Sequence, residues 1–151
     1  ALQYANAVGA LTIAVTCNDE ARMNQIAQIA IAAVTGPEVI SGSTRMKAGT
    51  AQKQILNMLS TGTMILVGRV YQNYMVYVQI NNQKLEERAR QILVKILDVS
   101  YDDACSLLSR AHQSVACAIV MELGNCSYEM ADNALKDHKG KLRDAIQSLL
   151  K

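Results

Sequence analysis

The chain has 151 residues, of which 50% are hydrophobic but only 4% are aromatic, and this length suits one compact domain with or without a small appendage. Fifteen basic and thirteen acidic residues nearly cancel, which excludes a strongly polycationic nucleic-acid binder. Charged residues make up 19% of the chain, below the roughly 25% usual in soluble domains, so we expect much of its surface to be covered.

The first third of the chain has the pattern of a parallel α/β sheet. Residues 1–8 are typical of the end of a helix, and apolar runs over 10–17 and 29–34 predict strands covered on both faces. A short polar segment over 18–25 predicts a helix between them. Two strands alone would leave the faces and edges of such a sheet exposed. The chain opens inside a helix, so we expect that it was cut from a longer protein and that the missing strands lie upstream or in a partner chain.

The next element is expected to be one long helix. It is predicted to begin with Ser43 or Thr44 as its N-cap and to end near Val67, before Gly68. From Gln54 onward its side chains are apolar nearly all round, which predicts that the helix is largely buried.

An internal repeat dominates the rest of the chain. The pattern over 71–78 fits a strand or a helix equally well, and a charged amphipathic helix is expected over about 82–97. In the last segment, 98–151, Ser100 and the positions after it match Ser127 and its followers at an offset of 27 residues. Each copy predicts a Ser-capped helix, a turn and a second helix, and so a small all-helical tail.

One segment, residues 36–53, has the residue types of a ligand site. It follows a predicted parallel strand and crosses a helix start, where free N–H groups attract anions. Its polar side chains are Glu38, Ser41, Ser43, Thr44, Arg45, Lys47, Thr50 and Lys53. The cations and hydroxyls suit a phosphate, and Glu38 suits hydrogen bonding to sugar hydroxyls or proton transfer. A capped helix start with solvated basic side chains fits the same residues about as well.

The same segment carries a resemblance to a known family. Its sequence is Gly-Pro-Glu-Val-Ile-Ser-Gly-Ser-Thr-Arg-Met-Lys-Ala-Gly-Thr-Ala-Gln-Lys, and further matching motifs lie at 56–62, 68–71 and 81–85. Together these motifs closely resemble the N-acetylmuramic acid 6-phosphate etherases. More distantly, the chain is similar to the sugar-isomerase (SIS) domains of glucosamine-6-phosphate synthase and the glucokinase regulatory protein.

The resemblance implies a fold and a reaction. Residues 1–97 would be the C-terminal part of a doubly wound αβα SIS domain with a parallel sheet, and 98–151 a helical tail. The family is dimeric and binds a phosphorylated amino sugar. It is a lyase that cleaves the D-lactyl ether of N-acetylmuramic acid 6-phosphate by elimination and hydration, without a metal or other cofactor. The products are N-acetylglucosamine 6-phosphate and D-lactate, a step in cell-wall amino sugar recycling.

The resemblance also assigns site residues. The substrate-binding positions are Glu38, Ser41, Ser43, Thr44, Arg45 and Lys47. Glu38 lies where related isomerases place an acid near the sugar, which makes it a candidate auxiliary group. The family's two principal catalytic glutamates, and the loops that hold most of the phosphate, belong to the half that precedes this chain. We therefore expect that this chain alone does not turn over the substrate.

One departure from the family and two alternative functions stay open. The chain has Tyr77 where the family has an acid, which puts in doubt any contact by that acid. A non-catalytic phosphosugar-binding regulator of the SIS family, or a protein-interaction module carried by the tail, would also fit these residues. His112 and His138 lie in the turns of the repeat and are expected to be ordinary surface residues.

The remaining composition argues against several other classes of site. The cysteines at positions 17, 105, 117 and 126 form no C-x-x-C pair and lie near no histidine at zinc spacing, so we expect reduced cysteines and no metal. The uncharged stretches carry polar residues or are too short for a signal peptide or membrane span. We expect a cytoplasmic protein with no nucleic-acid or membrane partner.

Overall fold

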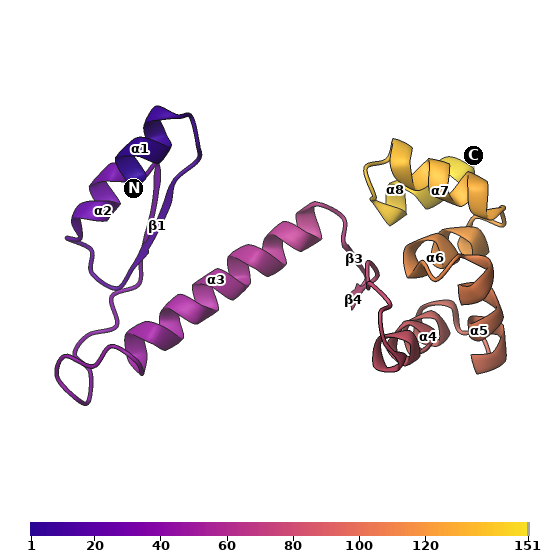
Figure 1. Cartoon of the computed structure of the whole chain (residues 1–151), viewed down its shortest axis with the longest axis horizontal. Helices are drawn as coiled ribbons and strands as arrows, with labels where there is room; N and C mark the ends of the chain where they lie inside the picture. Colours follow the sequence, from indigo (N-terminus) through magenta and orange to yellow (C-terminus); the bar gives the residue numbers. More distant parts are fainter. Residues whose placement is uncertain (151) are drawn as a thin grey trace. The chain divides into compact units, whose positions relative to one another are not determined.

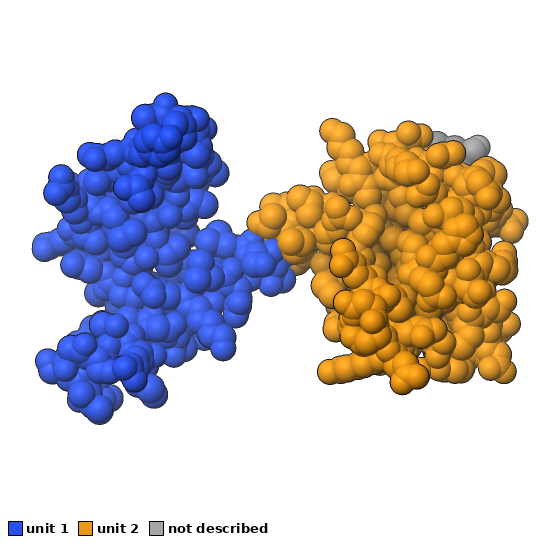
Figure 2. Space-filling model, in the orientation of Figure 1, with its two compact units in different colours: residues 1–61 blue, residues 62–151 orange. Residues whose placement is uncertain are grey.

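The computed structural model describes residues 1–150 (Figure 1). It divides into two compact units, Ala1–Thr61 and Gly62–Lys151, which Figure 2 colours blue and orange. None of the helices in the described chain is long and apolar enough to cross a membrane.

The first unit contains the parallel strand pair that the sequence predicts. Its first elements are α1 (Leu2–Ala7), β1 (Ile13–Thr16), α2 (Arg22–Ile26) and β2 (Ile29–Ala32). The strands pair in parallel, with Ile13 opposite Ile29, so the expectation of a parallel α/β arrangement is confirmed. Thr12 joins these elements, because its hydroxyl donates to the Asn6 side chain at 2.6 Å and accepts from the Gln28 N–H at 3.0 Å.

The long helix α3 (Lys47–Leu66) ends before Gly68 as expected, but its burial does not follow the prediction. Ile55 is its one buried residue in the described chain, while Leu56 is 58% exposed and Leu66 is 79% exposed. The expectation of a largely buried helix is therefore wrong for this chain. The apolar pattern predicted a covering layer, and residues 1–150 do not supply it.

The segment that the sequence left open is a β-hairpin. Strands β3 (Val70–Tyr71) and β4 (Tyr74–Met75) pair antiparallel, and Gln72 takes a positive φ of 53° in the turn between them. Val76, directly after β4, is 1% exposed and joins the core of the second unit. The hairpin is thus anchored by the residue that follows it.

Five helices complete the second unit. They are α4 (Gln83–Leu97), α5 (Tyr101–Arg110), α6 (Val115–Leu123), α7 (Tyr128–Asp137) and α8 (Leu142–Leu149). Their inward faces form one apolar cluster in which Leu93, Leu108 and Ile119 are fully buried. Helix α4 shares this core with the tail helices, so it belongs to the same compact unit as the tail. That unit begins at Gly62. The expected division of the protein at residue 97 stays a prediction.

The two copies of the 27-residue sequence repeat have similar local structures. Ser100 caps α5 by accepting from the Asp103 N–H at 3.1 Å, and Ser127 caps α7 by accepting from the Met130 N–H at 3.3 Å. The turn after each of these helices closes in the same way. Gln113 N–H donates to the Leu108 carbonyl, and Gly140 N–H donates to the Leu135 carbonyl. Both turn residues have a positive φ, 64° at Gln113 and 81° at Gly140.

Candidate functional site

The candidate site is the loop over residues 36–46, which connects β2 to α3. Gly36 and Gly42 have φ values of 69° and 80°, a region that glycine adopts without a steric penalty. The Ser43 N–H donates to the Ile40 carbonyl at 3.1 Å and closes the turn. The loop therefore folds back so that Glu38 lies against the start of α3.

Glu38 is the cap of α3. One carboxylate oxygen accepts from the Lys47 N–H and the other from the Ala48 N–H, both at 3.0 Å. A carboxylate at this position also interacts favourably with the positive end of the helix dipole. The expectation that Ser43 or Thr44 caps the helix is wrong. The cap is the side chain of Glu38, which lies nine residues before the helix start.

The same geometry corrects the expectation of free N–H groups at this helix start. The Gly49 N–H donates to the Thr44 carbonyl at 2.9 Å, and the Thr50 N–H donates to the Met46 carbonyl at 3.2 Å. With Glu38 on the two preceding N–H groups, the first four donors of α3 are all occupied. A phosphate would bind at this helix end only by displacing the Glu38 carboxylate.

The hydrogen bonds to Glu38 also fix its protonation state. The N–H groups of Ala48 and then Lys47 lower the pKa of the Glu38 carboxyl below its ordinary value of 4.5, against a smaller opposing effect of burial. At neutral pH Glu38 is therefore an anion that accepts hydrogen bonds. In this conformation it is a poor proton donor.

The other predicted site residues share the loop but have different surroundings. Ser41, Thr44 and Arg45 are exposed and Ser43 is half-buried. Within residues 1–150 their side chains make no hydrogen bond or ion pair with other protein groups, so hydroxyls and a guanidinium are open to a ligand. The Lys47 ammonium instead donates to the Pro37 carbonyl at 2.8 Å and closes the loop on itself.

Tyr77, which lies where the resemblance implies an acid, has a packing role. Its hydroxyl donates to the Gly140 carbonyl at 2.8 Å, and the Arg69 guanidinium lies 4.3 Å from its ring centroid. Burial raises the pKa of the Tyr77 phenol. Tyr77 thus joins the segment after the hairpin to the turn between α7 and α8.

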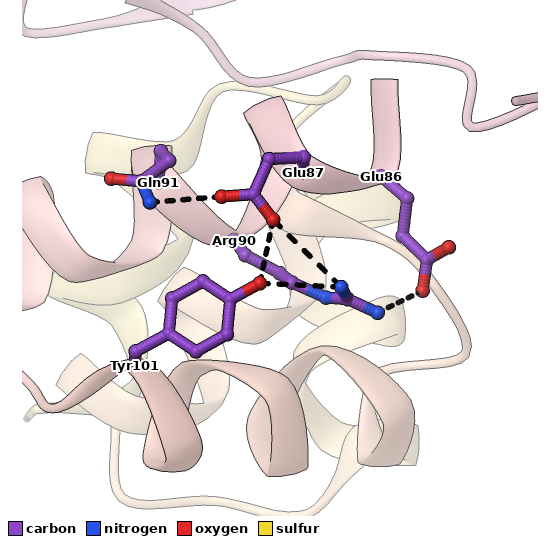
Figure 3. A network of polar contacts seen from close by, with 5 residues as sticks. All are labelled: Glu86, Glu87, Arg90, Gln91 and Tyr101. Atoms are coloured by element: carbon purple, nitrogen blue, oxygen red, sulfur yellow. Dashed lines mark hydrogen bonds and ion pairs between the residues drawn. The ribbon is translucent and has the colours of Figure 1, made fainter. Parts of the chain in front are cut away.

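Sequence reasoning missed a polar network between α4 and α5 (Figure 3). Tyr101 donates to Glu87, which also accepts from Gln91, while Arg90 pairs with Glu86 and donates to the Tyr101 hydroxyl. The hydrogen bond from Tyr101, followed by that from Gln91, lowers the pKa of the Glu87 carboxyl. Charge spacing along α4 was the available signal, but the partner on α5 could be found only from the packing.

Residues 1–150 offer no cluster of three or more His, Cys, Asp or Glu side chains that could hold a metal ion. All four cysteines are free thiols, with Cys117 buried and the others partly exposed. His112 stacks on Tyr128 with ring centroids 4.2 Å apart, which gives it a structural contact outside the candidate loop.

The comparisons with known proteins agree with the loop motif. No family model matches the chain. Among curated proteins it is similar to "N-acetylmuramic acid 6-phosphate etherase 1" of Enterococcus faecalis, with 48% identity over 146 residues, 97% of this chain and 49% of the relative. The etherases of Shouchella clausii and Francisella tularensis subsp. holarctica are 50% and 49% identical over 96% and 95% of the chain. The resemblance drawn from residues 36–53 is thereby confirmed, and the chain spans about half the length of these relatives.

Proposed function

We propose that this chain is the C-terminal half of an N-acetylmuramic acid 6-phosphate etherase, a lyase. The whole protein would cleave the D-lactyl ether of its substrate to give N-acetylglucosamine 6-phosphate and D-lactate. The observation that carries this proposal is the identity of 48–50% over nearly the whole chain to proteins of that name. The parallel strands followed by a ligand-type loop support an SIS phosphosugar-binding domain completed by the other half.

Within this proposal the loop binds the sugar part of the substrate. The open side chains of Ser43, Thr44 and Arg45 supply donors for sugar hydroxyls or for the substrate's anionic groups. Glu38 acts as a positioning residue, because its carboxylate holds the loop on the first turn of α3. Lys47, on the first turn of α3, also holds the loop, because its ammonium donates to the Pro37 carbonyl.

The catalytic glutamates and most of the phosphate site would come from the other half of the domain. This chain alone is therefore expected to be inactive. The exposed apolar side of α3 supports a covered position in the whole protein, which we take to be a homodimer. Four free cysteines support a cytoplasmic location.

A chimaeric enzyme tests the proposal. The N-terminal half of the Enterococcus faecalis relative is joined to this chain, and D-lactate release from N-acetylmuramic acid 6-phosphate is measured for the chimaera and for the chain alone. We expect turnover by the chimaera only. A chimaera that folds, judged by circular dichroism and size-exclusion chromatography, yet releases no D-lactate would contradict the etherase assignment.

Matched variants locate the substrate loop. Arg45→Gln in the chimaera is expected to lower kcat/KM by about 10- to 100-fold, the range for losing one charge-assisted hydrogen bond. Arg110→Gln, at an exposed position at the end of α5 and outside residues 36–53, is the control and should change kcat/KM little. Equal losses in both variants would count against a substrate role for the loop.

The alternative of a non-catalytic phosphosugar-binding regulator is not favoured, because the relatives are named as etherases. It makes a distinct prediction. A folded chimaera would then bind a phosphorylated amino sugar without releasing D-lactate.

A further inference from the structure

A cavity lies within the unit formed by residues 62–150, away from the candidate loop in the sequence. It has a volume of about 260 Å³ and is lined by the hairpin flank, the start of α6 and the end of α7. Drug-sized ligands usually occupy cavities of about 300–1,000 Å³. The size of this cavity therefore suits a smaller molecule or a small ionic group.

The charges around the cavity favour an anion. Arg69, Lys136 and Lys139 line it, whereas Asp132 is its one carboxylate. Asp132 is already paired with Lys136, which leaves Arg69 and Lys139 without an acidic partner among the described residues. Cations gathered in a concave surface attract oxyanions and hold them by charge-assisted hydrogen bonds.

The neutral groups of the cavity do not oppose this charge. Burial raises the pKa of the Cys117 thiol and of the Tyr77 phenol, so both are uncharged at neutral pH. The first turn of α6 also lies at the cavity, with Ser114 capping the Cys117 N–H at 3.2 Å. The positive end of that helix adds to the field of the basic side chains.

Tyr77 positions Arg69 at the cavity. The Arg69 guanidinium lies over the Tyr77 ring at 4.3 Å, and the Tyr77 hydroxyl is fixed by the Gly140 carbonyl at 2.8 Å. Lys139 and Gly140 are neighbours in the turn after α7. The cation Lys139 therefore lies next to the residue that holds Tyr77, the ring on which Arg69 packs. Tyr77 thereby links Arg69 to the turn that carries Lys139, while both cations stay exposed to solvent.

We propose that this cavity binds a small phosphate-type oxyanion, with Arg69 and Lys139 as its principal ligands and Lys136 as a third cation. The anion is either inorganic phosphate or the phosphate group of a small phosphate ester. The proposal does not rest on the proposed etherase activity, because none of these residues lies in the candidate substrate loop.

The test is a titration of the ¹⁵N-labelled 151-residue chain, followed by NMR. Inorganic phosphate and N-acetylglucosamine 6-phosphate are added separately at constant ionic strength. We expect saturable shifts of the amides at 114–117 and 139–140. Tighter binding of one probe than of the other would identify its source as the free ion or the ester.

Variants give the result its specificity. Arg69→Gln and Lys139→Gln are each expected to weaken phosphate binding by about three- to tenfold, and Arg69→Lys to retain part of it. Lys84→Gln, an exposed cation outside the cavity, should bind like the original chain. Thermal unfolding followed by circular dichroism checks that each variant is folded.

Three outcomes would overturn the proposal. One is the absence of saturable shifts with both probes. Another is an equal loss of affinity in Lys84→Gln and in the cavity variants. The third is a set of shifts centred on residues 36–50, which would place the anion at the candidate substrate loop.

Discussion

The two compact units use similar apolar residues with opposite results. In residues 62–150, hairpin and helices close around a cluster that buries Leu93, Leu108 and Ile119 fully. In residues 1–61, Ala14 and Ile55 are the buried apolar residues, and side chains such as Leu56 and Met58 face outward. The difference teaches that composition sets how much apolar surface a segment has. The number of packing elements decides whether the segment can cover that surface itself.

The strongest test of this contrast compares matched leucines. Leu108→Ala, at a site that is 1% exposed, should reduce the free energy of unfolding of the second unit by about 2–5 kcal/mol. Leu56→Ala, at a site of the first unit that is 58% exposed, should change the free energy of unfolding of that unit by less than about 0.5 kcal/mol. Urea unfolding of the 151-residue chain measures both. Equal losses would show that α3 is covered in solution, for example by a second copy.

A second prediction concerns the contact between Tyr77 and Gly140. A Cβ added to Gly140 would lie 2.9 Å from the Tyr77 hydroxyl, and the φ of 81° already disfavours any other residue. Gly140→Ala should therefore destabilise the second unit by about 1–3 kcal/mol. Its effect should be smaller in a Tyr77→Phe background, which removes the oxygen. If the two changes were additive in thermal unfolding, the close approach would not be the cause.

The repeat supplies a smaller prediction of opposite sign. Gln113 occupies the turn position that Gly140 fills in the second copy, with a φ of 64°. Gln113→Gly should stabilise the second unit by about 0.5–1 kcal/mol, because glycine has no steric penalty in this region. Gln147→Gly, at an exposed position inside α8, is the control and should destabilise it by a similar amount. A loss of stability in Gln113→Gly would show that its side chain makes a compensating contact.

The smallest effect is expected at the start of α3 in the first unit. Glu38→Gln should increase the hydrogen-exchange rates of the Lys47 and Ala48 amides and leave the second unit unchanged. The pKa of Glu38 is lowered below 4.5 in the folded chain, so its stabilising contribution is fully present above about pH 4.5. That contribution is lost as the pH falls through the folded pKa. If the Lys47 and Ala48 amides of the variant exchange with the same pH dependence as those of the original chain, the capping role is contradicted.

Local patterns in the sequence were enough to predict much of the fold. The apolar runs located both parallel strands, and the 27-residue offset located the two capped helix pairs with Ser100 and Ser127 as their caps. These features depend on residues close in the chain or on a repeated pattern. The exposure of α3 could not be predicted, because an apolar pattern along a helix does not tell whether other elements pack on it.

The candidate loop shows the same limit. Its residue types predicted a ligand segment, and the structure places Ser43, Thr44 and Arg45 on one loop with open side chains. The capping role of Glu38 was not predicted. Its carboxylate bonds the N–H groups of residues 47 and 48, and known capping motifs use residues much closer to the helix start. For the same reason, the contacts of Tyr77 with Arg69 and Gly140 became visible only in the packed unit.

The Glu38 cap also makes the start of α3 a site that already carries its own anion. A carboxylate joined to the helix by a short stretch of chain acts as an internal competitor, with an effective concentration on the order of millimolar or higher. Free anions from solution must exceed that concentration to reach the Lys47 and Ala48 amides. Neutral hydroxyls that bind the neighbouring side chains meet no such competition. The start of α3 therefore disfavours free anions, while the Ser43, Thr44 and Arg45 side chains of the loop stay available.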